Sequence, residues 1–291
     1  MNQKIVDELK ENGFVKNSEN ILTSDELHEL KNCINKLFSD KSIDINTGSN
    51  ALVIDSLAGI DPSLDFLLTK LITHENVRFV LNYVLGDNYK ISQITVRRSI
   101  PGDTGLDLHQ DAPGETGMIL LLTDNLRSDG ATSFLSKSHQ LPRWSRKISW
   151  SSVTISSPFL SPLKGKIGDI GFFFNRTWHA RLKNMSKKTH DVLLISFFPH
   201  SAIYESTYDE ERLKMLNQPE LRKLLDPNDG SIQINIKEDE DNNIPYVMKL
   251  ESPKYLNGPY KVKLLVLKVL SLQVVFSPIR WLYRLLNSLK I

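Results

Sequence analysis

The stretch Leu108-His-Gln-Asp-Ala-Pro-Gly-Glu-Thr-Gly-Met-Ile-Leu-Leu-Leu-Thr123 joins a loop to an apolar run. The loop, residues 101–117, is rich in Gly and Asp, and the run that follows, residues 118–123, is only six residues long. An apolar run of this length, bounded by turn residues, predicts a buried β-strand, because helices usually need about ten residues or more. The stretch therefore places the chain among proteins with a β-core.

Further short strands are predicted on both sides of this stretch. In residues 91–100, alternation puts Ile94, Val96 and Arg98 on one face and Gln93, Thr95 and Arg97 on the other. The remaining predicted strands are 132–135, 152–156, 170–174 and 192–198, and the predicted helices are 3–11, 24–38, 65–85 and 207–225. Many short strands with irregular loops predict a mainly β protein with flanking helices, as a sandwich or a jelly roll.

The bulk composition is that of a soluble globular protein. The chain has 291 residues, of which 40% are hydrophobic and 24% charged. Its single cysteine, Cys33, excludes an intrachain disulfide and a zinc ribbon and fits a reducing compartment. The N-terminus alternates charged with apolar residues and lacks the apolar core of a signal peptide. We therefore expect a cytoplasmic protein.

Positive charge is concentrated in the last 36 residues. Residues 256–291 contain no Asp or Glu and six Lys or Arg, so this tail carries +6 and the rest of the chain −4 of the net charge of +2. Beyond Pro278, a basic face opposes a leucine face, with Trp281 and Tyr283 beside them. A basic amphipathic helix of this kind suits the inner face of a membrane, and packing on the β-core or at a dimer interface is the alternative. We expect residues 1–250 to form the β-domain and 251–291 a separate basic amphipathic tail.

The first candidate functional residues are His109 and Asp111, an H-x-D element in the loop. Alternate side chains of an extended segment point the same way, so both can reach one ion. A second imidazole, His179, comes 68 positions after Asp111 and follows another predicted strand. Two imidazoles and one carboxylate can occupy one face of an octahedral Fe(II) and leave three positions open. H-x-D alone is weak, since a loop His bonded to its own Asp gives the same pattern.

Several ordered motifs around these residues resemble the phytanoyl-CoA dioxygenase-like family of Fe(II)/2-oxoglutarate oxygenases. The resemblance covers residues 6–199 and rests on these segments: 9–15 and 22–27, similar to the N-terminal element; Leu108-His-Gln-Asp111, similar to the metal motif; Gly130-Ala-Thr-Ser-Phe-Leu-Ser-Lys-Ser-His139; and Gly168-Asp169, Phe172-Phe-Phe174, Trp178-His179 and Asn184-Met-Ser186, similar to the second metal segment. Together they are far more specific than H-x-D.

The resemblance implies a double-stranded β-helix, with His109, Asp111 and His179 as ligands of Fe(II). It also implies 2-oxoglutarate as cosubstrate, whose oxidative decarboxylation drives hydroxylation of an unactivated C–H bond. Gln110 matches a family position near the cosubstrate. We expect a small-molecule substrate, or a saccharide or lipid-linked compound, which would explain the basic tail; no nucleic-acid signature is present.

One departure from the family pattern concerns the cosubstrate. The family usually has an Arg eleven residues after the distal His, and here that position is His190. An imidazole does not replace the two-pronged grip of a guanidinium on a carboxylate. Arg181 is our first candidate for this role, and His190 itself is expected to line the pocket. Other candidate cations are Lys187, Lys188, Arg97 and Arg98.

Two other functions remain open on the sequence. A cupin-like metalloenzyme that does not use 2-oxoglutarate would keep the metal ligands and explain His190. A non-catalytic, membrane-associated binding module would explain the tail and would leave His109 and Asp111 vestigial.

Overall fold

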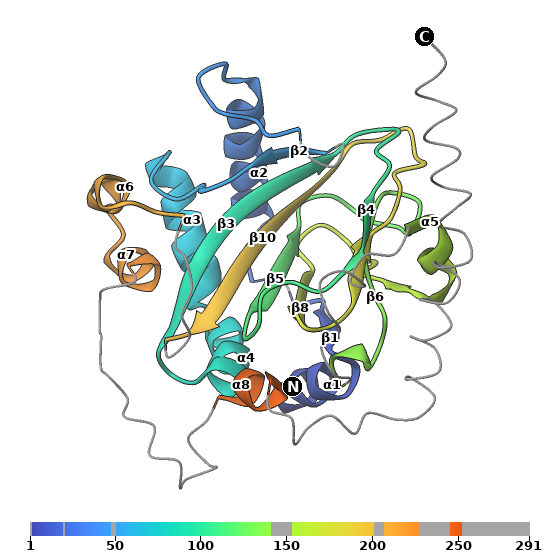
Figure 1. Ribbon diagram of the computed structural model, residues 1–291. Coiled ribbons are helices and arrows are strands. Elements are labelled where there is room, and N and C mark those ends of the chain that lie inside the picture. The colour runs from blue at the N-terminus through green and yellow to red at the C-terminus, as the bar shows by residue number, and fades with distance from the viewer. Residues whose placement is uncertain are drawn as a thin grey trace, which may run out of the picture.

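The computed structural model describes residues 2–19, 21–47, 51–140, 153–200, 207–226 and 245–251. Its longer helices come early in the chain, and most of its strands follow them (Figure 1). The strands are β1 (Phe14–Asn17), β2 (Leu52–Ile54), β3 (Tyr89–Ser99), β4 (Leu106–His109), β5 (Thr116–Leu121), β6 (Thr132–Phe134), β7 (Ser161–Pro162), β8 (Ile170–Phe174), β9 (His179–Arg181) and β10 (His190–Pro199). The α-helices are α1 (Asn2–Asn12), α2 (Ser24–Ser39), α3 (Pro62–Thr73), α4 (Glu75–Leu85), α5 (Val153–Ser156), α6 (Glu210–Met215), α7 (Pro219–Leu225) and α8 (Tyr246–Glu251).

Two antiparallel sheets make the β-core. The larger sheet has the strand order β1-β8-β5-β10-β3-β2, and the smaller one the order β4-β9-β6-β7. In the larger sheet β10 pairs with β3 on one side and with β5 on the other, so strands far apart in sequence lie side by side. This crossed order is that of a jelly roll, and it confirms the predicted fold class.

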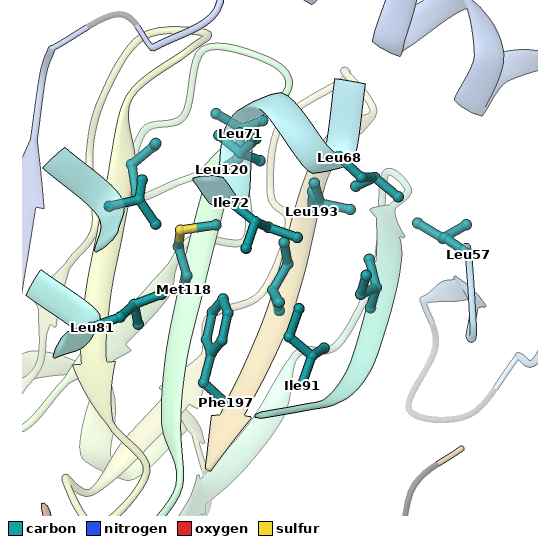
Figure 2. Close-up of a cluster of buried hydrophobic side chains, with 14 of the residues drawn as sticks. Leu57, Leu68, Leu71, Ile72, Leu81, Ile91, Met118, Leu120, Leu193 and Phe197 are labelled. Carbon is teal, nitrogen blue, oxygen red and sulfur yellow. The ribbon is translucent and has the colours of Figure 1, made fainter. Parts of the chain in front are cut away.

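One face of the larger sheet is covered by helices. Apolar side chains of α3 and α4 pack on apolar side chains of β3, β5 and β10 (Figure 2). Ile94 and Val96 are fully buried on this side, as the alternation of residues 91–100 predicts. The opposite face of β3 is therefore turned towards the smaller sheet, and it carries Gln93, Thr95 and Arg97.

Capping groups decide where the helices begin and end. Thr23 and Glu26 form a capping box at the start of α2, close to its predicted start. The single helix predicted for residues 65–85 is wrong, because the chain forms α3 and α4 with a break at His74. His74 has an extended backbone (ψ 137°), and its ring accepts a hydrogen bond from the Asn76 amide to begin α4.

Two other predictions fail for local reasons. The strand predicted at 152–156 is wrong: Val153–Ser156 forms the helical turn α5, and the Asp107 carboxylate accepts the Val153 amide at 2.9 Å. The helix predicted at 207–225 is interrupted between α6 and α7. Gln218 has an extended backbone before Pro219, because a residue that precedes proline avoids the helical region.

The basic tail and most of its neighbourhood lie outside the described residues. This applies to residues 252–291 and to 227–244, so the amphipathic tail and the domain boundary at 250 stay predictions. Among the helices that the structure describes, none has the length and apolar character required to cross a membrane.

Candidate metal centre

His109 and His179 meet across two strands of the smaller sheet. They are register partners on β4 and β9, with ring centroids 4.3 Å apart. His109 Nδ1 lies 2.7 Å from the carbonyl oxygen of Asp107, and His179 Nδ1 lies 2.8 Å from that of Thr177. A carbonyl can only accept, so each Nδ1 donates and each Nε2 points to Asp111, where a metal ion would take the place of its proton.

Asp111 follows β4 and completes the group. Its Oδ1 lies 3.3 Å from His109 Nε2, and its Oδ2 lies 3.0 Å from His179 Nε2. Its backbone amide donates to the Asn175 carbonyl at 2.9 Å, which fixes the loop after β4. Burial opposes ionisation of the Asp111 carboxyl, but the charges and hydrogen bonds of the two histidines outweigh it and hold its pKa well below the usual range.

These three side chains suit a divalent transition metal. One ligand atom from each lies within 4.8 Å of the other two, and no other such group of His, Cys, Asp or Glu occurs in the part of the chain that the structure describes. Two imidazoles with one carboxylate, all on one side of the ion, form the donor set of non-haem Fe(II) oxygenases. The residues therefore fit Fe(II), and they are the three side chains that the sequence singled out as candidate ligands.

A cavity of about 570 Å³ opens beside the three residues. This is large enough for a small-molecule ligand. Its walls come from both sheets, and its lining residues are Val53, Asp55, Gln93, Thr95, Arg97, Leu106, His109, Asp111, Ala112, Glu115, Thr132, Phe173, Asn175, His179, Ala180, Arg181, Leu194 and Ser196.

Arg181 lines this cavity but forms a buried ion pair. A guanidinium nitrogen of Arg181 contacts a carboxylate oxygen of Asp103, and both side chains are almost fully buried. Asp103 also accepts from Ser99 Oγ at 2.7 Å and from the Gly105 amide at 2.9 Å. Burial lowers the pKa of Arg181 to about 9, with a further contribution from the charge of Arg97. Arg181 is therefore held by the protein itself.

Arg97 is the second guanidinium on the cavity wall. It lies on β3 opposite Val192 of β10, in the row of side chains that faces the smaller sheet. Its Nε is buried and has no hydrogen-bond partner among the described residues. Burial lowers the pKa of Arg97, while the nearby carboxylates of Asp111 and Asp55 raise it. This cation has unused donor capacity beside the candidate metal ligands.

His190 and Gln110 do not line the cavity. His190 begins β10, and its Nδ1 lies 3.0 Å from the Asp124 carbonyl oxygen while its Nε2 lies 3.2 Å from Ser186 Oγ. The Gln110 amide donates to the carbonyl of Arg176. The structure thus brings Arg181 to the candidate metal ligands and ties His190 and Gln110 to loop backbone.

Two lining residues were absent from the sequence prediction, Glu115 and Asn175. Burial, and then the charge of Asp111, raise the pKa of the Glu115 carboxyl to about 7, although hydrogen bonds from Ser196 and Asn175 oppose the shift. Only the position of Glu115 four residues after Asp111 could have pointed to it. Asn175 had no sequence signal, because it reaches the cavity through the pairing of β5 with β8.

Comparison with known proteins relates the chain to oxygenases by sequence. No family model matches it. Dioxygenase af480 of Aspergillus fumigatus is 24% identical over 180 residues, a segment that makes up 56% of this chain and 56% of that protein. The matched segment thus spans little more than half the length of this relative.

Solved structures match over more of the chain. SnoK, a non-haem α-ketoglutarate-dependent carbocyclase from nogalamycin biosynthesis, superposes with a TM-score of 0.57 at 16% identity, covering 72% of this chain and 88% of that one. HygX from Streptomyces hygroscopicus, solved with nickel, 2-oxoglutarate and hygromycin B, gives 0.57 at 12% identity and covers 76% and 94%. AviO1 from Streptomyces viridochromogenes gives 0.57 at 14%, covering 70% and 98%.

The chain has the jelly-roll fold of these enzymes. The fold and the weak sequence match agree with the family resemblance of the sequence. At such identities the structural likeness establishes the fold, and the activity of this chain has to be argued from its own residues.

Proposed function

We propose that the protein is an Fe(II)/2-oxoglutarate-dependent oxygenase that hydroxylates a C–H bond of a small-molecule, saccharide or lipid-linked substrate. The observation that carries the proposal is the meeting of His109, Asp111 and His179 at one end of a cavity that also contains a guanidinium with a free donor. The sequence relative named a dioxygenase and the structural relatives named as α-ketoglutarate-dependent enzymes support it.

The metal would be held by the two histidine Nε2 atoms and the Asp111 carboxylate. When bound, Fe(II) with 2-oxoglutarate and dioxygen supplies the oxidising power for hydroxylation, with succinate and CO₂ as the other products. The carbonyls of Asp107 and Thr177 orient the imidazoles. Phe173 and Phe134 pack beside His179, with ring centroids 5.2 and 6.1 Å away, and give the ring an apolar neighbourhood on that side.

We further propose that Arg97 binds the distal carboxylate of 2-oxoglutarate. A carboxylate of the cosubstrate could accept charge-assisted hydrogen bonds from Arg97, because the Nε of Arg97 has no hydrogen-bond partner among the described residues. Arg181, our first candidate from sequence, already forms an ion pair with Asp103. It would therefore add to the positive potential of the cavity and would not form a new ion pair with the cosubstrate. Arg97 on β3 would thus replace the arginine that the family carries on the strand corresponding to β10.

The test is turnover of 2-oxoglutarate by the purified full-length chain. With Fe(II), ascorbate and 2-oxoglutarate labelled at C1, the protein should release labelled CO₂. His109→Ala and Asp111→Ala should reduce the release to background, and His28→Ala, an exposed histidine, should not. Release that is unchanged in the first two variants would overturn the proposal.

The two rival functions make different predictions. A metalloenzyme without 2-oxoglutarate would show no binding of that compound to the metal-loaded protein in calorimetry. A non-catalytic module would bind no divalent metal. The two guanidiniums on the cavity wall and the convergent Nε2 atoms favour the oxygenase.

For location, we propose a cytoplasmic protein that contacts an anionic membrane surface through residues 256–291. Each cation near such a surface contributes about 1 kcal/mol, so six are sufficient for peripheral binding at low salt. Flotation with vesicles containing phosphatidylserine tests this. Binding should be lost when Lys261, Lys263, Lys268, Arg280, Arg284 and Lys290 are changed to Gln, and equal flotation of both forms would contradict it.

A further inference from the structure

A row of polar side chains crosses the cavity face of the larger sheet. Gln93 on β3 is the register partner of Ser196 on β10, and Ser196 is the partner of Gly117 on β5. Glu115, two residues before Gly117, bonds to the side chains of Ser196 and Asn175. Asp55, after β2, extends the row at its other end. We call Asp55, Gln93, Thr95, Ser196, Glu115 and Asn175 the polar row.

The outer end of the polar row presents a fixed acceptor. Asp55 Oδ1 accepts from Gln93 Nε2 at 2.7 Å and from Thr95 Oγ1 at 2.8 Å. The Asp55 side chain is solvent-exposed, so its carboxylate keeps lone pairs for a ligand that enters the cavity. Two donors from β3 hold it in one orientation.

The inner end of the polar row contains an unpaired buried group. Asn175 is 2% exposed, and its Oδ1 has no hydrogen-bond partner among the described residues. Exchanging its oxygen and nitrogen would leave an unpaired donor instead, so one polar atom is unsatisfied in either orientation. Such a group is unfavourable unless a ligand or a water molecule completes its hydrogen bond. The Asn175 carbonyl also holds the Asp111 amide, so this end lies beside the candidate metal ligands.

We infer that the substrate presents a polyhydroxylated group to the polar row, with one sugar ring at the inner end and further hydroxyls towards Asp55. As a substrate assignment this rests on the proposed oxygenase. A hydroxyl can donate to Asp55 and can donate to or accept from Asn175, so it satisfies either amide orientation. Side chains opposite one another on adjacent strands lie about 5 Å apart, so one ring with several hydroxyls spans neighbouring members of the row, and only a longer polyol reaches both ends.

An acyl chain in the same position would be disfavoured. It would strip water from Asp55, Glu115 and Asn175 and return no hydrogen bond. A lipid-linked substrate would therefore place its polar head, not its chain, against the polar row.

Binding of defined probes to the full-length chain, loaded with Ni(II) and 2-oxoglutarate so that no turnover occurs, tests the inference. The probes are methyl α-D-glucopyranoside, methyl α-D-mannopyranoside and myo-inositol, with decanoate as the acyl probe. Calorimetry should show binding of at least one polyol in preference to decanoate. Asn175→Leu, at the inner end of the row, should weaken it about tenfold, the value of one hydrogen bond to a ligand.

The matched control is Asn88→Ala, an exposed asparagine that lines a second cavity. It should leave polyol binding unchanged, and thermal melting of every variant checks that it is folded. Tighter binding of decanoate, no binding of any polyol, or equal polyol binding by Asn175→Leu would each overturn the inference. The two proposals fail in different ways. If the protein binds a polyol, even without metal, but releases no labelled CO₂, the oxygenase proposal is wrong and the inference about the polar row stands.

Discussion

His109 on β4 and His179 on β9 are register partners, although the pairing between these strands is irregular. Leu106 pairs with Arg181 and His109 with His179, so three steps on β4 match two on β9. An extra residue of this kind is a β-bulge, which re-aims side chains and is common beside active sites. The bulge brings both Nε2 atoms to Asp111.

Metal binding should depend on this convergence. We expect one Co(II) per wild-type chain and a bound-metal absorption spectrum, and His179→Ala should lose most of its affinity because only two ligands remain. Metal analysis after gel filtration and a Co(II) titration measure this. His28→Ala is the control, and stoichiometric Co(II) in His179→Ala would place the metal elsewhere.

Arg97 should dominate the affinity for 2-oxoglutarate. Arg97→Gln should raise the Kd of the Ni(II)-loaded protein about 100-fold, since it removes charge-assisted hydrogen bonds of on the order of 3 kcal/mol. Calorimetric titration with 2-oxoglutarate gives the value.

Arg98→Gln is the matched control for that experiment. Arg98 adjoins Arg97 but points to the other face, where it pairs with Asp191 at 2.7 Å and covers the ring of Phe38. Its loss should lower stability and leave the Kd unchanged. If Arg181→Gln raised the Kd and Arg97→Gln did not, Arg181 would be the anchor instead.

Gly105 should be essential to the pairing of β4 with β9. Its φ is +82°, and an added Cβ would lie 2.3 Å from the carbonyl oxygen of Arg181. Gly105→Ala should therefore lower the free energy of unfolding by about 3 kcal/mol or more and also weaken metal binding, because the aligned histidines would shift. Urea unfolding and the Co(II) titration report the two effects.

Gly102→Ala is the control that separates the cost of a left-handed backbone from the cost of the steric overlap at Gly105. Gly102 has a similar φ of +85°, but nothing lies within 4 Å of an added Cβ. This variant should lose only about 1 kcal/mol, the ordinary cost of a left-handed backbone in a residue with a side chain, and should bind Co(II) normally. Equal losses in the two variants would show that the contact with Arg181 is unimportant.

His139 should make the protein sensitive to acid. Burial lowers the pKa of this imidazole from 6.5 to about 4. Between these values the unfolded chain takes up a proton and the folded chain does not, so stability falls as pH falls from about 6.5 to 4. The loss reaches about 3 kcal/mol at the lower limit.

His139→Gln should remove this contribution, because the amide can still donate to the Lys10 carbonyl that His139 Nε2 contacts at 2.9 Å. Urea unfolding of both proteins from pH 7 to pH 4 measures the difference. Parallel curves would mean that His139 is not the group responsible.

The sequence by itself predicted β3, β5, β8 and β10 of the larger sheet and singled out the three candidate ligands, but it placed β4 in a loop and did not predict β9. Alternation along residues 91–100 separates the core face from the cavity face, because side chains of a strand point to opposite sides. His109 and Asp111 could be identified as candidate ligands because they are two residues apart on an extended segment. His179 could be identified because several ordered motifs surround it.

Only the tertiary structure decided which cation is available. From sequence Arg181 was the first candidate and Arg97 one of the others. The structure separates them by partners from distant loops: Asp103 for Arg181, and Asp124 with Ser186 for His190. The polar row depends in the same way on strand register, which no local pattern specifies. Short-range periodicity fixes which face a side chain occupies, but long-range pairing fixes what it meets there.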